Sequence, residues 1–148
     1  MNRTISYVII ISFGAIVVMV ALSFPELLSN RNSFLSNFVG PNLLSILGVI
    51  LAITLASIGQ VHLSLNRIEE HYKRRAFHKT RSGLQNAAYW LIALFMICIM
   101  AIYLKSTLPQ IDWIEAILNG AALLILLWYM LILISIVQMT FAIEADID

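Results

Sequence analysis

Charged side chains are scarce in this sequence. Of its 148 residues, nine are Lys or Arg and eight are Asp or Glu, so 11% are charged, whereas 61% are hydrophobic. Soluble domains carry about 25% charged residues, and a water-soluble fold of this composition would leave much apolar surface in water. The formal net charge of +1 creates no basic field for nucleic acid, so we expect no direct nucleic-acid binding.

Cysteine and catalytic motifs are also nearly missing. The single cysteine, Cys98, can form neither an internal disulfide nor a cysteine zinc site, and it is interpreted as a small buried hydrophobe. The chain contains no HExxH, GxSxG, CxxC or Walker glycine loop. The carboxylate pair Asp112/Glu115 is better explained by helix capping than by catalysis. We therefore expect no enzyme, no cofactor and no metal site.

Charge is wholly absent from four long stretches, residues 4–25, 32–66, 82–104 and 116–143. A membrane-spanning helix needs roughly 20 mostly apolar residues, and a charge at mid-bilayer is costly. Lipid offers no partner for free backbone groups, so each span must be helical. The sequence thus predicts an all-α integral membrane protein, a single-domain bundle of four transmembrane helices with spans near residues 5–24, 43–65, 86–104 and 115–137.

Basic residues predict the orientation. Six of the nine Lys and Arg lie in residues 66–83, here called the basic segment. Because loops rich in Lys and Arg stay in the cytoplasm, we place the basic segment and both termini in the cytoplasm, with the chain as a multi-pass protein of the inner membrane. The first span resembles a signal peptide in its Arg3, its apolar core and the small-x-small pattern of Ala21, Leu22 and Ser23. Its apolar run is longer than a usual signal core, so we expect it to be retained.

The basic segment is the strongest local feature. Leu65, Ile68, Tyr72 and Ala76 form one helical stripe, which predicts a helix continuous or nearly so with the second span, and Gly83 is interpreted as a stop signal. Whether this helix projects or lies on the membrane stays open. The acidic tail, residues 144–148, could pair with it. The candidate residues for binding a partner or lipid headgroups are Arg67, Lys73, Arg74, Arg75, Lys79, Arg81, Glu144, Asp146 and Asp148.

Three interpretations of the basic segment are open. It could be a stop-transfer cluster that fixes topology and touches anionic headgroups, a docking surface for a cytoplasmic protein, or a direct ligand site. The histidines at 62, 71 and 78 are spaced by 9 and 7 residues. Since these spacings fit no helical metal pair, we interpret them as solvated or headgroup histidines.

The second span carries a small-residue stripe and several polar residues. The stripe, named for helix packing, contains Gly48, Ala52, Ala56 and Gly59. Small residues at this spacing permit close helix approach, either inside one bundle or between subunits. The polar positions either bond neighbouring helices and their own backbone or line a pore formed by several subunits. The pore candidates are Thr54, Ser57, Gln60, Asn119 and Gln138.

The loop of residues 25–42 has apolar residues at helical spacing: Leu27, Leu28, Phe34, Leu35, Phe38 and Val39. This pattern is typical of a short amphipathic helix on the outer interface, where it would seal the top of the bundle. Pro41 suits the first turn of the helix that follows.

Two functions are consistent with these features. No ionisable residue lies centrally in any span, which argues against coupled carriers and pumps. We expect a small oligomeric scaffold or sensor that lies in the lipid bilayer and engages a cytoplasmic protein partner, and the alternative is a small oligomeric ion channel. The gross plan is similar to that of small membrane subunits of bacterial complexes, including some phage-defence systems. That similarity of architecture supplies no functional residues, although it suggests a defence or stress-response setting.

Overall fold

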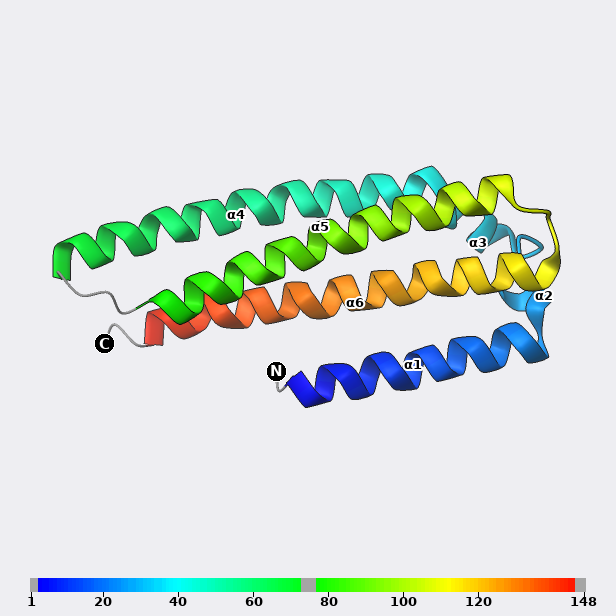
Figure 1. Ribbon diagram of the computed structural model, residues 1–148, viewed down its shortest axis with the longest axis horizontal. Helices are drawn as coiled ribbons and strands as arrows, with labels where there is room; N and C mark the ends of the chain where they lie inside the picture. Colours follow the sequence, from blue (N-terminus) through cyan, green and yellow to red (C-terminus); the bar gives the residue numbers. More distant parts are fainter. Residues whose placement is uncertain (1–2, 73–76, 146–148) are drawn as a thin grey trace.

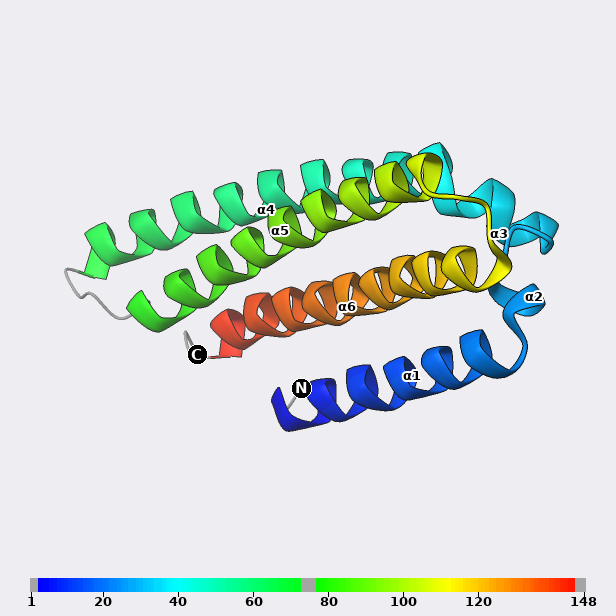
Figure 2. The same cartoon turned by 45° about the vertical axis from the view of Figure 1, so that its right-hand side comes forward.

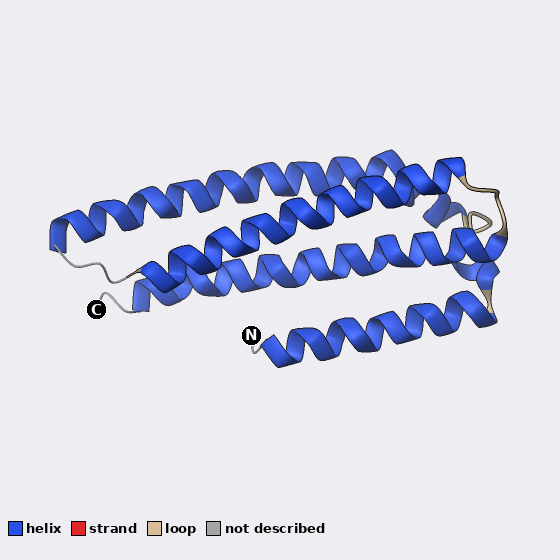
Figure 3. Ribbon diagram, viewed as in Figure 1, coloured by secondary structure: helices blue, strands red, loops and turns tan. Residues whose placement is uncertain are grey.

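The computed structural model is all helical and describes residues 3–72 and 77–145. Four long helices, α1 (Arg3–Ser23), α4 (Leu43–Tyr72), α5 (His78–Thr107) and α6 (Asp112–Ala145), run nearly side by side, as Figures 1 and 3 show. Each is long and apolar enough to cross a membrane. The prediction of an all-α membrane protein with four such helices is therefore confirmed.

The two ends of the molecule differ in how the long helices are connected there. One end, the cap end, holds α2 (Pro25–Leu28), α3 (Ser33–Asn37) and a kinked segment at Phe38–Asn42. The other, the hairpin end, holds the end of α4, the start of α5 and the last turn of α6. Figures 1 and 2 show that α4, α5 and α6 all extend beyond α1 at the hairpin end.

The core lies mainly among α4, α5 and α6. Leu47, Leu91, Leu94 and Tyr129 are almost fully buried there, and the Tyr129 hydroxyl donates a hydrogen bond to the Leu47 carbonyl over 3.3 Å. Helix α1 packs on α6, on the side away from α4 (Figure 2).

Little of the apolar surface is covered within one chain. In the most apolar window of each long helix, only 6–33% of the residues are buried. The remaining apolar side chains face outward, and in water they would be strongly unfavourable. They are suited to contact with lipid.

Two glycines outside the small-residue stripe, Gly120 and Gly83, lie where two helices approach each other closely. A Cβ added at Gly120 of α6 would overlap Val17 Cγ1 of α1. One added at Gly83 of α5 would lie 3.0 Å from Met139 Sδ of α6. The interpretation of Gly83 as a helix stop is wrong, since it lies inside α5, where its lack of a side chain lets α6 approach.

The loop of residues 25–42 is not one continuous helix. Its helical turns are interrupted between Leu28 and Ser33, and the chain turns again at Val39 and Gly40 before Pro41 leads into α4. Leu35 and Val39 are buried, whereas Leu27 and Phe34 are exposed. The predicted apolar spacing therefore corresponds to two short helical turns and a kink. The Ser29 and Asn32 side chains bond the local backbone between the two turns.

Candidate functional site

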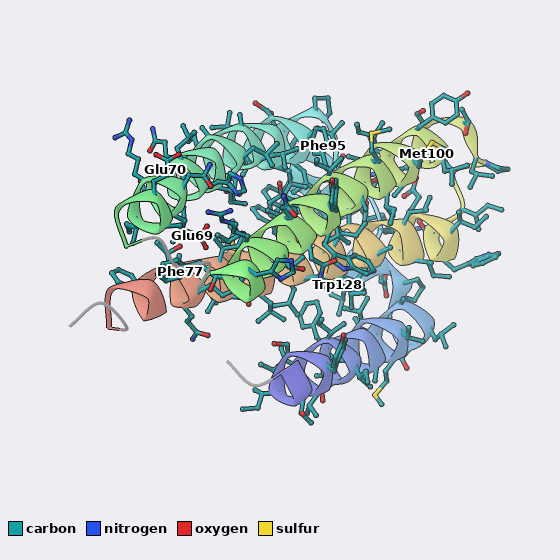
Figure 4. All side chains as sticks on the ribbon, turned by 60° about the vertical axis from the view of Figure 1, so that its left-hand side comes forward. Glu69, Glu70, Phe77, Phe95, Met100 and Trp128 are labelled. Atoms are coloured by element: carbon teal, nitrogen blue, oxygen red, sulfur yellow. The ribbon has the colours of Figure 1, made fainter. Side chains whose placement is uncertain are left out.

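An ion pair closes the hairpin end. The Arg81 side chain of α5 donates from Nη2 to Glu69 Oε2 of α4 over 2.8 Å. The other carboxylate oxygen of Glu69 accepts the backbone N–H of Phe77 over 3.1 Å. In Figure 4, Glu69 and Phe77 lie close together between α4 and the start of α5. One carboxylate thus binds the first turn of α5 twice and fixes how the two helices meet.

This pair is shielded from solvent. The side chains of Arg81 and Glu69 are 23% and 15% exposed, and Arg81 Nε is buried without a partner within the described part of the chain. Partial burial strengthens the attraction between the charges. Removal of either side chain would leave the other charge partly buried and without a compensating partner. Arg81, a candidate for binding a partner, is therefore engaged within the chain.

The other basic candidates are placed unevenly. Arg67 is exposed on α4, next to the exposed Glu70, and Lys79 lies in the first turn of α5. Glu144 lies in the last turn of α6. The remaining candidates, Lys73, Arg74, Arg75, Asp146 and Asp148, lie outside the described residues.

The small-residue stripe faces away from the chain. Ala52, Ala56 and Gly59 are exposed, and no described atom lies within 4 Å of a Cβ added at Gly59. Gly48 alone of the four meets another helix, since its added Cβ would lie 3.7 Å from the Phe95 ring of α5. Packing inside one chain therefore accounts for Gly48 and leaves the rest of the stripe uncovered.

The pore candidates do not line one path within a single chain. Thr54 is buried, Ser57 and Gln60 are exposed on α4, and Gln138 is exposed on α6. The Ser57 hydroxyl donates to the Ile53 carbonyl over 2.9 Å, which is the backbone bonding expected for serine in membrane helices. Asn119 lies at the other end of the molecule, among loop residues.

A polar cluster at the cap end escaped the sequence analysis. Glu115 of α6 is only 8% exposed, and its Oε2 accepts the backbone N–H of Asn30 over 3.0 Å. Asn119, one turn later and fully buried, donates from Nδ2 to the Leu28 carbonyl over 2.7 Å. These two side chains hold the loop after α2 onto α6, so Glu115 does more than cap its helix.

Two further contacts hold the cap end. Lys105 at the end of α5 donates from Nζ to the Val39 carbonyl over 3.0 Å, at the kink that precedes α4. Arg31 pairs with Asp112, the first residue of α6, over 2.8 Å. The charges nearest the cap thus join the loop to α5 and α6 and fix the structure of this end.

Among residues 3–72 and 77–145, no group of three His, Cys, Asp or Glu side chains could hold a metal ion. His62 lies half-buried on α4 and His78 is exposed at the start of α5. Cys98 is buried in the apolar core.

No family model, curated protein or solved structure matches this chain. Its function must therefore be inferred from its own residues.

Proposed function

We propose that this chain is a subunit of an oligomeric inner-membrane scaffold or sensor, which engages a cytoplasmic protein through the basic segment and the acidic tail. In this proposal the hairpin end and both termini face the cytoplasm, because the basic segment lies at that end. A defence or stress-response complex is the setting suggested by similarity of architecture alone.

The projecting hairpin end is the observation that carries this proposal. Helix α4 continues for residues 66–72 beyond the predicted span, which adds about 10 Å at 1.5 Å per residue. Helix α5 begins at His78, eight residues before its predicted span, which adds about 12 Å. A stop-transfer cluster needs charge only at the membrane surface, whereas in this proposal these helices carry it into the aqueous phase.

The Glu69–Arg81 pair gives that projection a defined shape. It joins α4 to α5 beyond the predicted spans, so the described ends of these two helices are held together. A charged surface carried on two joined helices loses less conformational entropy on binding than one carried on a flexible loop does. The acidic end of α6 lies at the same end of the molecule and offers charge of the opposite sign.

Uncovered helix surface supports assembly of several copies. The exposed side of α4 includes Ala52, Ala56 and Gly59, and small residues let membrane helices pack closely. In this proposal a second copy of the chain covers this surface in place of lipid.

Photo-crosslinking in intact cells tests this function. A photoreactive residue at Arg75 should form adducts with a soluble cytoplasmic protein, whereas one at Ser106, exposed at the cap end, should form none. The adduct should disappear in Arg74→Glu/Arg67→Glu and persist in the charge-conserving Arg74→Lys/Arg67→Lys. Labelling of Ser82→Cys from each side of the membrane controls for altered topology.

Two outcomes would overturn the proposal. One is the absence of soluble adducts at position 75 when the topology is unchanged. The other is ion flux through the purified oligomer in liposomes at rates typical of channels, which would establish the alternative function.

A further inference from the structure

Helix α4 is the least covered of the four long helices. It lies at the edge of the bundle, opposite α1 (Figures 1 and 2), and packs mainly on α5. The most apolar window of the stretch Pro25–Glu70, which contains most of α4, is 6% buried, the smallest share among the four candidate spans. The covered side of α4 includes the buried residues Leu47, Ile58 and Leu65. The opposite side of the helix is open to the surroundings of the chain.

The open side of α4 has a heptad spacing. Eight of its positions recur at alternating intervals of 4 and 3 residues, and seven of the eight are exposed. We call them the open seam: Ser45, Val49, Ala52, Ala56, Gly59, Leu63, Asn66 and Glu70. Such a repeat keeps one side of a helix against a parallel partner in a left-handed supercoil. The open seam therefore has the pattern of a helix-packing surface along most of α4.

Small side chains form the middle of the open seam. Ala52, Ala56 and Gly59 are exposed, and no described atom lies within 4 Å of a Cβ added at Gly59. Interfaces between membrane helices are enriched in small residues, because these let two backbones approach closely. Val49 and Leu63, 58% and 61% exposed, lie on either side of this region and offer larger apolar contacts.

An amide beside the open seam lacks a partner within one chain. Gln60 is exposed and lies five residues before the predicted end of its span. The neighbouring hydroxyls of Ser57 and Ser64 donate to backbone carbonyls of α4, whereas no hydrogen bond within residues 3–72 and 77–145 uses the Gln60 side chain. Lipid offers no partner for a polar group, and glutamine side chains can bond across membrane helices. Gln60 thus favours a second helix over lipid at this surface.

The charges at the hairpin end of the open seam are complementary to a second copy. Arg67 and Glu70 are both exposed, and neither is in the ion pairs found within residues 3–72 and 77–145. Figure 4 shows Glu70 on the outer side of α4 and Glu69 on the side that faces α5. In a parallel pair of α4 helices, Arg67 would lie about 4.5 Å along the axis from Glu70 of the partner subunit, at 1.5 Å per residue. A two-fold axis would form this ion pair twice and offset the repulsion between the two Glu70 carboxylates.

We infer that the open seam binds a second copy of the chain, as a parallel two-fold pair of α4 helices. Two copies inserted in the same orientation can make this contact, and a two-fold contact needs one self-complementary surface. The inference rests on the proposed function only in taking the chain to be oligomeric, and it names the helix that joins the copies. The pair would bring two hairpin ends together, which would raise the effective concentration for a cytoplasmic protein with two matching sites.

Cysteine crosslinking in native membranes tests this pair. In a Cys98→Ser background, Ala56→Cys and Leu63→Cys each place a thiol on the open seam. The matched controls Ser57→Cys and Ser64→Cys place it one residue later, at exposed positions of nearly the same depth outside the seam. A disulfide requires Cα atoms within about 7 Å of each other. After mild oxidation we expect a disulfide-linked dimer from both seam variants and loss of this product in both controls.

Charge variants test the reciprocal ion pairs. Arg67→Glu and Glu70→Arg should each weaken the dimer roughly tenfold, because two exposed ion pairs are lost. The exchanged variant Arg67→Glu/Glu70→Arg should recover most of this loss, since the opposite charges then meet again across the two-fold axis. Energy transfer between labelled copies, diluted into increasing amounts of lipid, measures dissociation of the dimer.

Three results would overturn the inference. They are equal crosslinking at seam and control positions, no crosslinking at either, and an exchanged variant that dimerises no more tightly than the single variants. The cysteine variants leave the basic segment unchanged, so soluble adducts at position 75 would still support the proposed function in these cases. A crosslinked dimer without such adducts would support the α4 pair and count against the cytoplasmic partner.

Discussion

Replacing Gly120 by alanine tests the contact that holds α1 onto α6. Gly120 is buried on α6, and a Cβ there would overlap Val17 Cγ1 of α1. Val17 is β-branched and has little freedom to rotate within a helix. We therefore expect α1 to move away from α6 in Gly120→Ala.

The expected magnitude follows from two opposing effects. Alanine is favoured over glycine in a helix by about 1 kcal/mol, whereas overpacking costs about 1–3 kcal/mol. Gly120→Ala should thus lower the free energy of unfolding by up to about 2 kcal/mol. Gly48→Ala is the matched control, since its Cβ would lie 3.7 Å from the Phe95 ring, an ordinary contact, and it should be stabilised by up to about 1 kcal/mol.

Unfolding in a titration with denaturing detergent, followed by circular dichroism, measures the difference. Adding Val17→Ala should recover part of the loss in Gly120→Ala, so the double variant should be more stable than the sum of the single effects. If Gly120→Ala were as stable as Gly48→Ala, α1 would not pack on α6 as described.

Three further predictions concern the hairpin end, the cap end and the oligomer. Glu69→Gln should destabilise the protein by about 1–3 kcal/mol, because a partly buried Arg81 loses its charged partner. Hydrogen exchange of the Phe77 amide should become faster in this variant. The control Glu70→Gln, at an exposed position, should change the stability by less than about 0.5 kcal/mol. Asn119→Ala should cost about 1–3 kcal/mol by removing the donor to the Leu28 carbonyl, and faster exchange at Asn30 would report the released loop. Gly59→Leu should leave the fold intact, since no described atom lies nearby, yet reduce the oligomeric mass in detergent; an unchanged mass would show that the stripe is not an interface.

The long helices could be predicted because one physical constraint acts along each of them. A span must exclude charge and form all its backbone hydrogen bonds within its own helix. Both requirements can be recognised from one continuous run of residues in the sequence. Ordinary helix-stop signals were less informative, as Gly83 shows. Its role is to let α6 approach α5, and a contact between two helices leaves no trace in the residues beside it.

The Glu69–Arg81 ion pair and the polar cluster at the cap end could be identified only from the structure. The Glu69 carboxylate binds Arg81, 12 residues away, and local helix spacing reaches only three or four residues. Glu115 binds Asn30 across 85 residues, and no spacing rule reaches that far. The small-residue stripe was ambiguous for a related reason, because packing within a chain and packing between chains need the same residues.

The most direct test of the account is the side of the membrane on which the hairpin end lies. In a Cys98→Ser background, Ser82→Cys marks the hairpin end and Ser106→Cys the cap end, and both positions are exposed. With a membrane-impermeant maleimide, we expect Ser106→Cys to react in intact cells whose outer membrane is permeable, and Ser82→Cys only in inverted inner-membrane vesicles. Reaction of both positions from the same side would contradict four membrane crossings, and the reverse pattern would place the basic segment outside the cytoplasm.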